Sequence, residues 1–109
     1  MGPDIADGAV VEVAGTRVFL PGDVVVYRHA DGTLLLHRVI GYRLVGGRLH
    51  LLAQADAAAA ADPPVPLAAV LGRAARVERS PGLWRPVPRR PLRAAARLVA
   101  YAAQRLRRR

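Results

Sequence analysis

The chain is 109 residues long, which allows one small domain with an appendage but not a two-domain enzyme. Hydrophobic residues make up 52% of it and aromatic residues only 5%, so we expect a core built from Val, Leu and Ala rather than from rings. The sequence contains no cysteine. Disulfide scaffolds, thiolate zinc sites and a cysteine nucleophile are therefore excluded.

Charge is distributed unevenly along the chain. All 17 basic residues are arginine, which excludes a lysine general base and a Schiff-base lysine. Residues 1–72 carry a formal charge of −2, whereas residues 73–109 carry +11. The basic character therefore belongs to the C-terminal tail.

Stretches rich in β-branched residues and bounded by Gly or Pro predict strands. Ala30-Asp31-Gly32 and Gly46-Gly47 predict the turns of two β-hairpins. We expect an all-β domain in which five antiparallel strands coil into a partial barrel. The expected strands are Ala9–Val13, Asp23–Arg28, Thr33–Tyr42, Arg48–Gln54 and Val70–Arg79.

The C-terminal part divides into a Pro-rich linker and a helix. Prolines recur between Ser80 and Pro91, so residues 80–91 are expected to lie outside both helix and sheet. Pro91 then opens an amphipathic Arg-rich helix over residues 92–109, with residues 1–79 as the β-domain. One face of this helix is apolar and the other is mostly arginine. The apolar face comprises Leu92, Ala95, Val99, Ala102 and Leu106, and the polar face Arg93, Arg97, Gln104 and Arg108.

Two interpretations of this helix stay open. It packs on the sheet with a solvated arginine face, or it lies on an anionic membrane surface. No apolar run reaches the roughly 18 to 20 residues of a membrane span, and the N-terminus lacks the regions of a signal peptide. The expected localisation is cytoplasmic or peripheral to a membrane.

Histidines and aspartates are the candidates for chemistry. His37 shares a strand face with Leu35 and Val39, where a histidine is more often a satisfied core or edge residue than a catalyst. The three histidines have no metal-ligand spacing, so neither a metal nor another cofactor is expected. Asp56 and Asp62 bracket an alanine run in a loop. Such carboxylates either cap their own turn or orient a nearby imidazole, and spacing alone leaves both roles open.

Five segments, taken together, resemble a known family. Their order and separation are similar to the boxes of type I signal peptidases and their self-cleaving repressor relatives. The resemblance covers residues 1–79 and implies a serine endopeptidase that hydrolyses extended peptides, such as secretory or leader peptides. The segments are Met1–Gly8, Pro21–Arg28, Leu36–Gly41, Gln54–Asp62 and Val70–Arg73.

Within that family, a chain without lysine resembles the endoplasmic-reticulum and archaeal type, which uses Ser, His and Asp. The resemblance implies that His37 is the general base and that Asp62 orients it. It implies that Asp56 supports the loop or shares that role, and that Pro3 and Ile5 contact substrate. The sequence departs from the family at Ala55, where the family has Gly.

The nucleophile is the largest departure. In the family the catalytic Ser immediately precedes the Met of the first box, so it is expected just before Met1. Ser80, Thr16 and Thr33 do not replace it, and the 109 residues by themselves are expected to be inactive. We favour an upstream serine.

The alternative is a catalytically inactive β-domain that binds a peptide or protein and is tethered to an anionic membrane by its tail. Nucleic acid is the least favoured partner, because the β-domain is acidic and has few aromatics.

Overall fold

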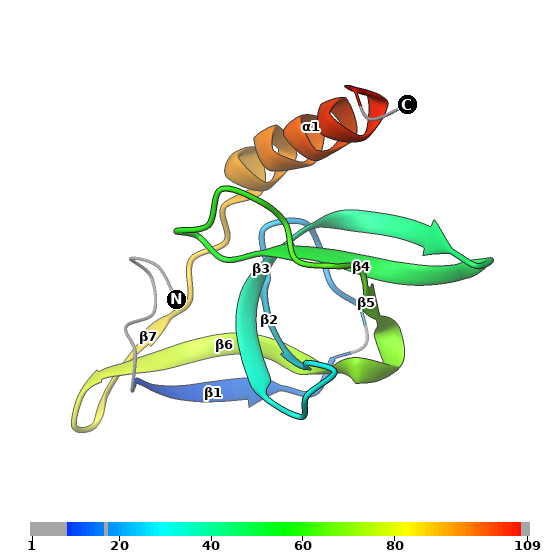
Figure 1. Cartoon of the computed structure of the whole chain (residues 1–109). Helices are drawn as coiled ribbons and strands as arrows, with labels where there is room; N and C mark the ends of the chain where they lie inside the picture. Colours follow the sequence, from blue (N-terminus) through cyan, green and yellow to red (C-terminus); the bar gives the residue numbers. More distant parts are fainter. Residues whose placement is uncertain (1–8, 17, 108–109) are drawn as a thin grey trace.

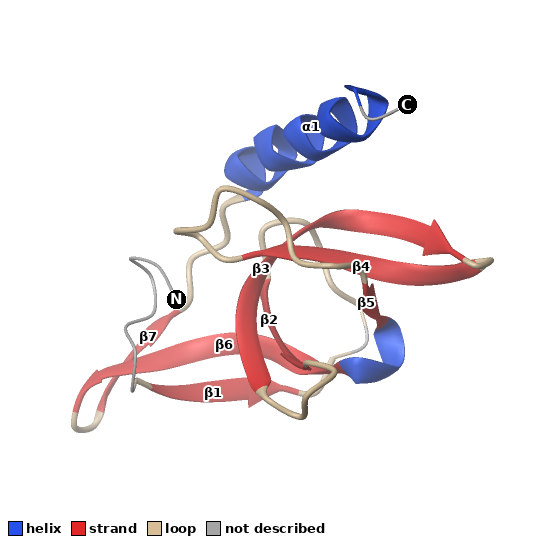
Figure 2. Cartoon of the chain, viewed as in Figure 1, coloured by secondary structure: helices blue, strands red, loops and turns tan. Residues whose placement is uncertain are grey.

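The computed structural model describes residues 9–16 and 18–107. They form one mostly β structure in which every strand pairing is antiparallel, with a single helix at the C-terminal end (Figures 1 and 2). The strands of the described chain are β1 (Val10–Ala14), β2 (Val24–Arg28), β3 (Leu34–Val45), β4 (Arg48–Gln54), β5 (Val65–Pro66), β6 (Val70–Ser80) and β7 (Leu83–Pro86). A 3₁₀ turn spans Leu67–Ala69 and α1 spans Pro91–Arg107.

The sheet runs in the order β1-β6-β2-β3-β4-β5, with β7 paired to β6, and it is not closed into a barrel. The five expected strands are all present. Both expected hairpins are confirmed: β2 and β3 join through the turn at Asp31-Gly32, and β3 and β4 join through Gly46-Gly47. Both glycines of the second turn have positive φ, 57° and 77°, as a tight two-residue hairpin requires.

The segment expected as a linker contains a strand. In β7, Trp84 pairs with Glu78 and Arg85 with Val77, so residues 83–86 belong to the sheet and the expectation for them is wrong. The prolines suggest a linker because a proline lacks the N–H that a central strand needs. A proline is still accommodated at a strand end or edge, and Pro86 lies at the end of β7. The two-residue β5 was not expected either.

The core lies on both faces of the sheet. On one face, Val25, Tyr27 and Val39 pack with Leu51 and Phe19. Leu35 packs against this cluster beside Val39, as the two-residue period predicted. On the other face, Ile40 and Leu52 pack beneath α1.

Helix α1 packs on the sheet through a face that the sequence did not indicate. Ala94 is fully buried, and Leu98 and Tyr101 pack beside it. Gly41 of β3 lies directly beneath Leu98: a Cβ there would be 2.9 Å from Leu98 Cδ1, so a side chain at this position would displace the end of Leu98. The helix therefore covers β3 with small and aromatic residues, and the apolar face expected from the sequence is turned elsewhere.

Candidate functional site

Strand β3 sends two adjacent side chains to opposite faces of the sheet. His37 pairs in register with Val25 of β2, and Arg38 pairs with Val24. Because successive residues of a strand alternate in direction, the two side chains meet different surroundings. Each of them binds one of the two aspartates that bracket the alanine-rich loop.

His37 lies against Asp62 and Tyr27. Its Nδ1 contacts Asp62 Oδ2, and the Tyr27 hydroxyl lies 3.1 Å from the same Nδ1 while also donating a hydrogen bond to Asp62 Oδ2. The rings of Tyr27 and His37 meet edge to face, with centroids 5.9 Å apart. The three side chains come from β2, β3 and the loop after β4, and they form one connected cluster, which we call the His37 cluster.

The carboxyl of Asp62 is held ionised within this cluster. Burial by itself raises the pKa of Asp62, but the hydrogen bonds with His37 and Tyr27 outweigh burial and bring the pKa below its ordinary value. The pKa of Tyr27 is raised well above its ordinary value by burial and by the adjacent Asp62 carboxylate. At neutral pH the cluster therefore contains a carboxylate that only accepts hydrogen bonds and a phenol that donates one.

The contact with Asp62 assigns the tautomer of His37. Nδ1 lies against Oδ2 of an ionised carboxylate, where two facing lone pairs would repel, so Nδ1 carries the imidazole proton and donates it to Oδ2. The lone pair is then on Nε2. Within residues 9–16 and 18–107, Nε2 has no hydrogen-bond partner. The imidazole is thus oriented through one nitrogen and free to accept a proton at the other.

A backbone hydrogen bond holds Asp62 in position. Its N–H donates to the carbonyl oxygen of Ala53 at the end of β4, over 2.8 Å, and Pro63 and Pro64 follow it. The Asp62 side chain is 24% exposed and that of His37 18%, so water or a ligand reaches both. A small cleft of about 140 Å³ opens beside Asp62 and Tyr27, between the β2–β3 turn and the Pro-rich stretch 63–66.

Asp56 does not join the His37 cluster. Its two carboxylate oxygens accept hydrogen bonds from Arg38 Nε and Nη2, at 2.8 and 2.9 Å, and both side chains are almost fully buried, 1% and 0% exposed. The other terminal nitrogen of Arg38 donates to the carbonyl oxygens of Gly22 and Pro88, each over 2.7 Å. Arg97 of α1 donates to the carbonyl oxygen of Asp56 over 2.6 Å.

The Arg38–Asp56 pair therefore joins segments that are distant in sequence. It ties β3 to the loop after β4, to the turn before β2 and to the chain that leads into α1. Of the two roles that the resemblance left open for Asp56, the geometry favours support of the loop.

The other two histidines make their hydrogen bonds outside the His37 cluster, although His29 lines the cleft beside Asp62. His29 contacts Asp31 within the β2–β3 turn, and His50 Nδ1 lies 3.0 Å from the carbonyl oxygen of Arg48 on its own strand. In the described part of the chain, no group of three or more metal-ligating side chains comes together. Pro3 and Ile5, expected to contact substrate, lie outside the described residues.

None of the three hydroxyls named earlier reaches His37. Thr33 is four residues away along the same chain, about 13 Å at the rise of a strand. Ser80 lies seven residues beyond Arg73, the β6 residue in register with Val25 and hence with His37, which is about 23 Å along the strand. Thr16 is engaged in its own turn with Val18. The sequence argument against these hydroxyls agrees with the geometry.

The sequence did not lead us to expect that Tyr27 and Arg38 bind the two aspartates. Tyr27 lies two residues after Val25 on β2, so the register of the β2–β3 hairpin is the signal that brings it beside His37. Arg38 immediately follows His37, and an arginine inside an otherwise apolar strand signals a buried partner. The partner of each residue becomes visible only after the strands are paired.

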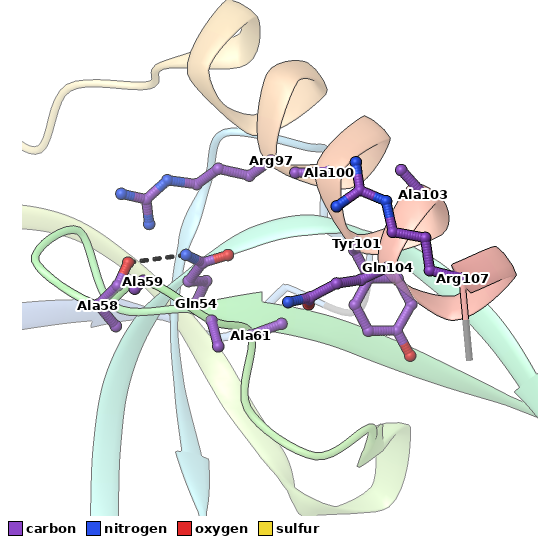
Figure 3. Close-up of a pocket in the computed structure, with 11 residues that line it drawn as sticks. Gln54, Ala58, Ala59, Ala61, Arg97, Ala100, Tyr101, Ala103, Gln104 and Arg107 are labelled. Carbon is purple, nitrogen blue, oxygen red and sulfur yellow. Dashed lines mark hydrogen bonds between the residues drawn. The ribbon is translucent and has the colours of Figure 1, made fainter.

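A larger groove lies on the other face of the sheet. It has a volume of about 420 Å³ and separates α1 from the alanine-rich loop (Figure 3). Gln54 lines it and donates a hydrogen bond to the carbonyl oxygen of Ala58 over 2.8 Å. Gln54 is in register with Arg38, so this groove opens on the face opposite His37. Its lining residues are Ala, Gln, Arg and Tyr, which offer no nucleophile paired with a base.

Comparison of the chain with protein-family models, with curated proteins and with solved structures finds no match in any of the three. Its function is therefore argued from the geometry of the His37 cluster.

Proposed function

We propose that the chain carries the general base and the orienting carboxylate of a serine endopeptidase of the signal-peptidase class, and that the sheet is the partial barrel of that class. The observation that supports this most is the contact between Asp62 and Nδ1 of His37. The resemblance implies that Asp62 orients His37 across 25 residues of sequence, and the two side chains lie together. A carboxylate on Nδ1 with a free Nε2 is the arrangement that a catalytic histidine needs.

The proposed reaction is peptide-bond hydrolysis through an acyl-enzyme. His37 Nε2 accepts the proton of the serine hydroxyl as the oxygen attacks the scissile carbonyl carbon. The resulting imidazolium returns the proton to the leaving amine when the peptide C–N bond breaks. Water then attacks the ester with the same histidine as base, which releases the acid and restores the serine. Asp62 stays ionised throughout and stabilises the imidazolium.

The nucleophile in this proposal is a serine immediately before Met1, as the resemblance implies. The proposed substrate is an extended peptide that adds as a further strand to an open edge of the sheet. A sheet that is not closed retains such edges, at β1, β5 and β7 in the described chain. Small side chains beside the scissile bond are expected if the specificity of the family applies here.

The first test is the N-terminal peptide of the native protein, identified by mass spectrometry of material from its own organism. We expect a chain that extends upstream and has serine directly before Met1. A native chain that starts at Met1 or Gly2 would contradict the enzyme proposal. It would favour the alternative, a catalytically inactive β-domain that binds a peptide or a protein.

The second test uses a fluorophosphonate probe, which labels activated serines. We expect the 109-residue chain to remain unlabelled and the chain with its native upstream serine to be labelled at that serine. His37→Ala should abolish labelling, and His50→Ala is the matched control because the His50 side chain bonds to the carbonyl oxygen of Arg48 on its own strand and lies outside the His37 cluster. Labelling that survives His37→Ala, or labelling of the 109-residue chain at a single site, would contradict the proposal.

A further inference from the structure

Helix α1 presents an apolar face to the outside of the molecule. Leu92, Val99 and Leu106 are 85%, 69% and 69% exposed. They are spaced by seven residues, two turns of helix, and therefore form one stripe along α1. The packed residues Ala94, Leu98 and Tyr101 lie on the other side of the helix axis. A helix that packs on a sheet normally turns polar side chains to solvent, whereas α1 packs through one apolar face and exposes this second apolar stripe.

Alanines and a groove widen this outward stripe. Ala95, Ala96 and Ala102 are exposed beside it, so no charged side chain interrupts the stripe. On one flank the stripe adjoins a groove of about 380 Å³ between α1 and strands β3 and β4, which Ala102 and Leu106 line together with Tyr42 and Leu52. Arg43 and Arg105 also line this groove, so apolar and cationic side chains meet there.

Arginines border the stripe on both sides. Arg93 follows Leu92 and Arg105 precedes Leu106, so their side chains lie roughly 100° around the helix in opposite directions. Both are exposed, as is Arg107. Residues 79–109 include ten arginines and no Asp or Glu. The surface around the stripe is therefore cationic.

We propose that the outward face of α1 docks on an anionic lipid bilayer. Leucine and valine side chains enter the boundary between headgroups and acyl chains, and the bordering arginines extend to the lipid phosphates. Charge complementarity selects this occupant, because anionic headgroups offset the arginines while the acyl chains cover the stripe. The stripe runs along the length of α1, so the docked helix lies in the plane of the interface. In the part of the chain that the structure describes, no helix is long and apolar enough to cross a membrane.

A second copy of the chain suits this surface less well. Two α1 helices packed through their stripes would bring their bordering arginines together. No carboxylate within residues 79–109 is present to offset them. Any protein that covered this surface would have to supply negative charge itself, as an anionic lipid surface does.

The test is flotation of the 109-residue chain with phosphatidylcholine vesicles, prepared with and without phosphatidylglycerol. We expect binding only to vesicles with the anionic lipid, weakened by added salt. Val99→Ser combined with Leu106→Ser should weaken binding by at least about tenfold, because two apolar side chains no longer enter the interface. Val18→Ser combined with Leu34→Ser is the matched control, since those side chains are also exposed, 73% and 53%, but lie on the β-domain.

Arg93→Gln combined with Arg107→Gln gives a second, independent variant that should weaken binding to the anionic vesicles. Failure to bind these vesicles, equal binding to vesicles of phosphatidylcholine alone, or unchanged binding of the Val99/Leu106 variant would overturn the proposal. The proposal would also be overturned if the wild-type chain bound no vesicles but dimerised in sedimentation velocity, and the Val99/Leu106 variant did not dimerise. That result would identify a second copy as the occupant. None of these outcomes depends on whether the chain is a peptidase.

Discussion

Two aspartates on either side of one alanine-rich loop meet two neighbouring residues of one strand, yet they occupy different environments. Asp56 forms a doubly hydrogen-bonded pair with Arg38, and both side chains are sealed from solvent. Asp62 contacts His37 in a cluster that solvent reaches. The alternation of β3 produces this division, because it directs Arg38 and His37 to opposite faces of the sheet.

The difference separates a site that holds the fold from a site available for chemistry. The Arg38 guanidinium donates hydrogen bonds to Asp56 and to the carbonyl oxygens of Gly22 and Pro88, which are groups of the protein itself. The His37 imidazole uses one nitrogen for orientation and keeps the other for a substrate proton. Burial thus distinguishes two carboxylates that the sequence presents as equivalent.

Replacement of the buried carboxylate should have the largest effect. Asp56→Asn leaves the Arg38 charge buried without its counter-ion, so we expect the free energy of unfolding to fall by about 3–5 kcal/mol. Chemical denaturation followed by circular dichroism measures this loss. A loss below about 1 kcal/mol, the range of exposed ion pairs, would contradict the assignment of Asp56 to the fold.

The matched replacement in the His37 cluster should cost less. Asp62→Asn removes a charged acceptor from His37 and Tyr27 but leaves them partly hydrated, so we expect a loss of about 1–2 kcal/mol. The lowered pKa of Asp62 adds a dependence on pH. Because the unfolded chain binds this proton first as pH falls, stability is retained above the ordinary carboxyl pKa of about 4 and is lost below it.

The acid limb of that dependence is measured by denaturation at a series of pH values. The stability of the wild-type chain should fall more steeply below pH 4 or so than that of the Asp62→Asn variant. Parallel curves for the two proteins would show that the Asp62 carboxylate is not stabilised by the cluster.

Removal of the phenolic hydroxyl is expected to have a smaller effect. Tyr27→Phe deletes one hydrogen bond to Asp62 and should cost about 1 kcal/mol at neutral pH. Since the pKa of Tyr27 is raised in the folded protein, ionisation above pH 10 or so favours the unfolded chain. The wild-type chain should therefore lose stability in this alkaline range, and Tyr27→Phe should lose less. Equal alkaline losses in thermal melts would contradict the position assigned to Tyr27.

His37→Gln should change stability least, by about 0.5–1 kcal/mol, because Asp62 keeps its hydrogen bond with Tyr27. The same substitution should abolish fluorophosphonate labelling in a chain with the native upstream serine. A large loss of stability with retained labelling would reverse the roles that we assign to the two faces of β3.

The sequence predicted much of the sheet, since β-branched runs and Gly turns are local signals. It did not predict β7, because prolines indicate a linker and only the partner strand β6 shows that an edge position accommodates them. The helical period identified which residues of α1 share a face. It could not identify the face that packs, because that face is set by contacts with a distant strand, such as the contact of Leu98 with Gly41 of β3.

The candidate site was predictable only in part. The His37–Asp62 contact followed from the resemblance, whereas spacing alone left several roles open for each aspartate. Arg38 and Tyr27 were missed because their partners lie 18 and 35 residues away in sequence. Contacts of this kind become visible only when strand register and the path of the loop are known.

The tautomer of His37 tests the central claim most directly. Two-bond ¹H–¹⁵N correlation spectra of the uniformly ¹⁵N-labelled chain at neutral pH distinguish a protonated from an unprotonated ring nitrogen. We predict that Nδ1 of His37 carries the proton and Nε2 does not, and that Asp62→Asn removes this preference while His50→Ala leaves it unchanged. A neutral His37 protonated at Nε2 would contradict the account, because that nitrogen could not accept a proton from a serine.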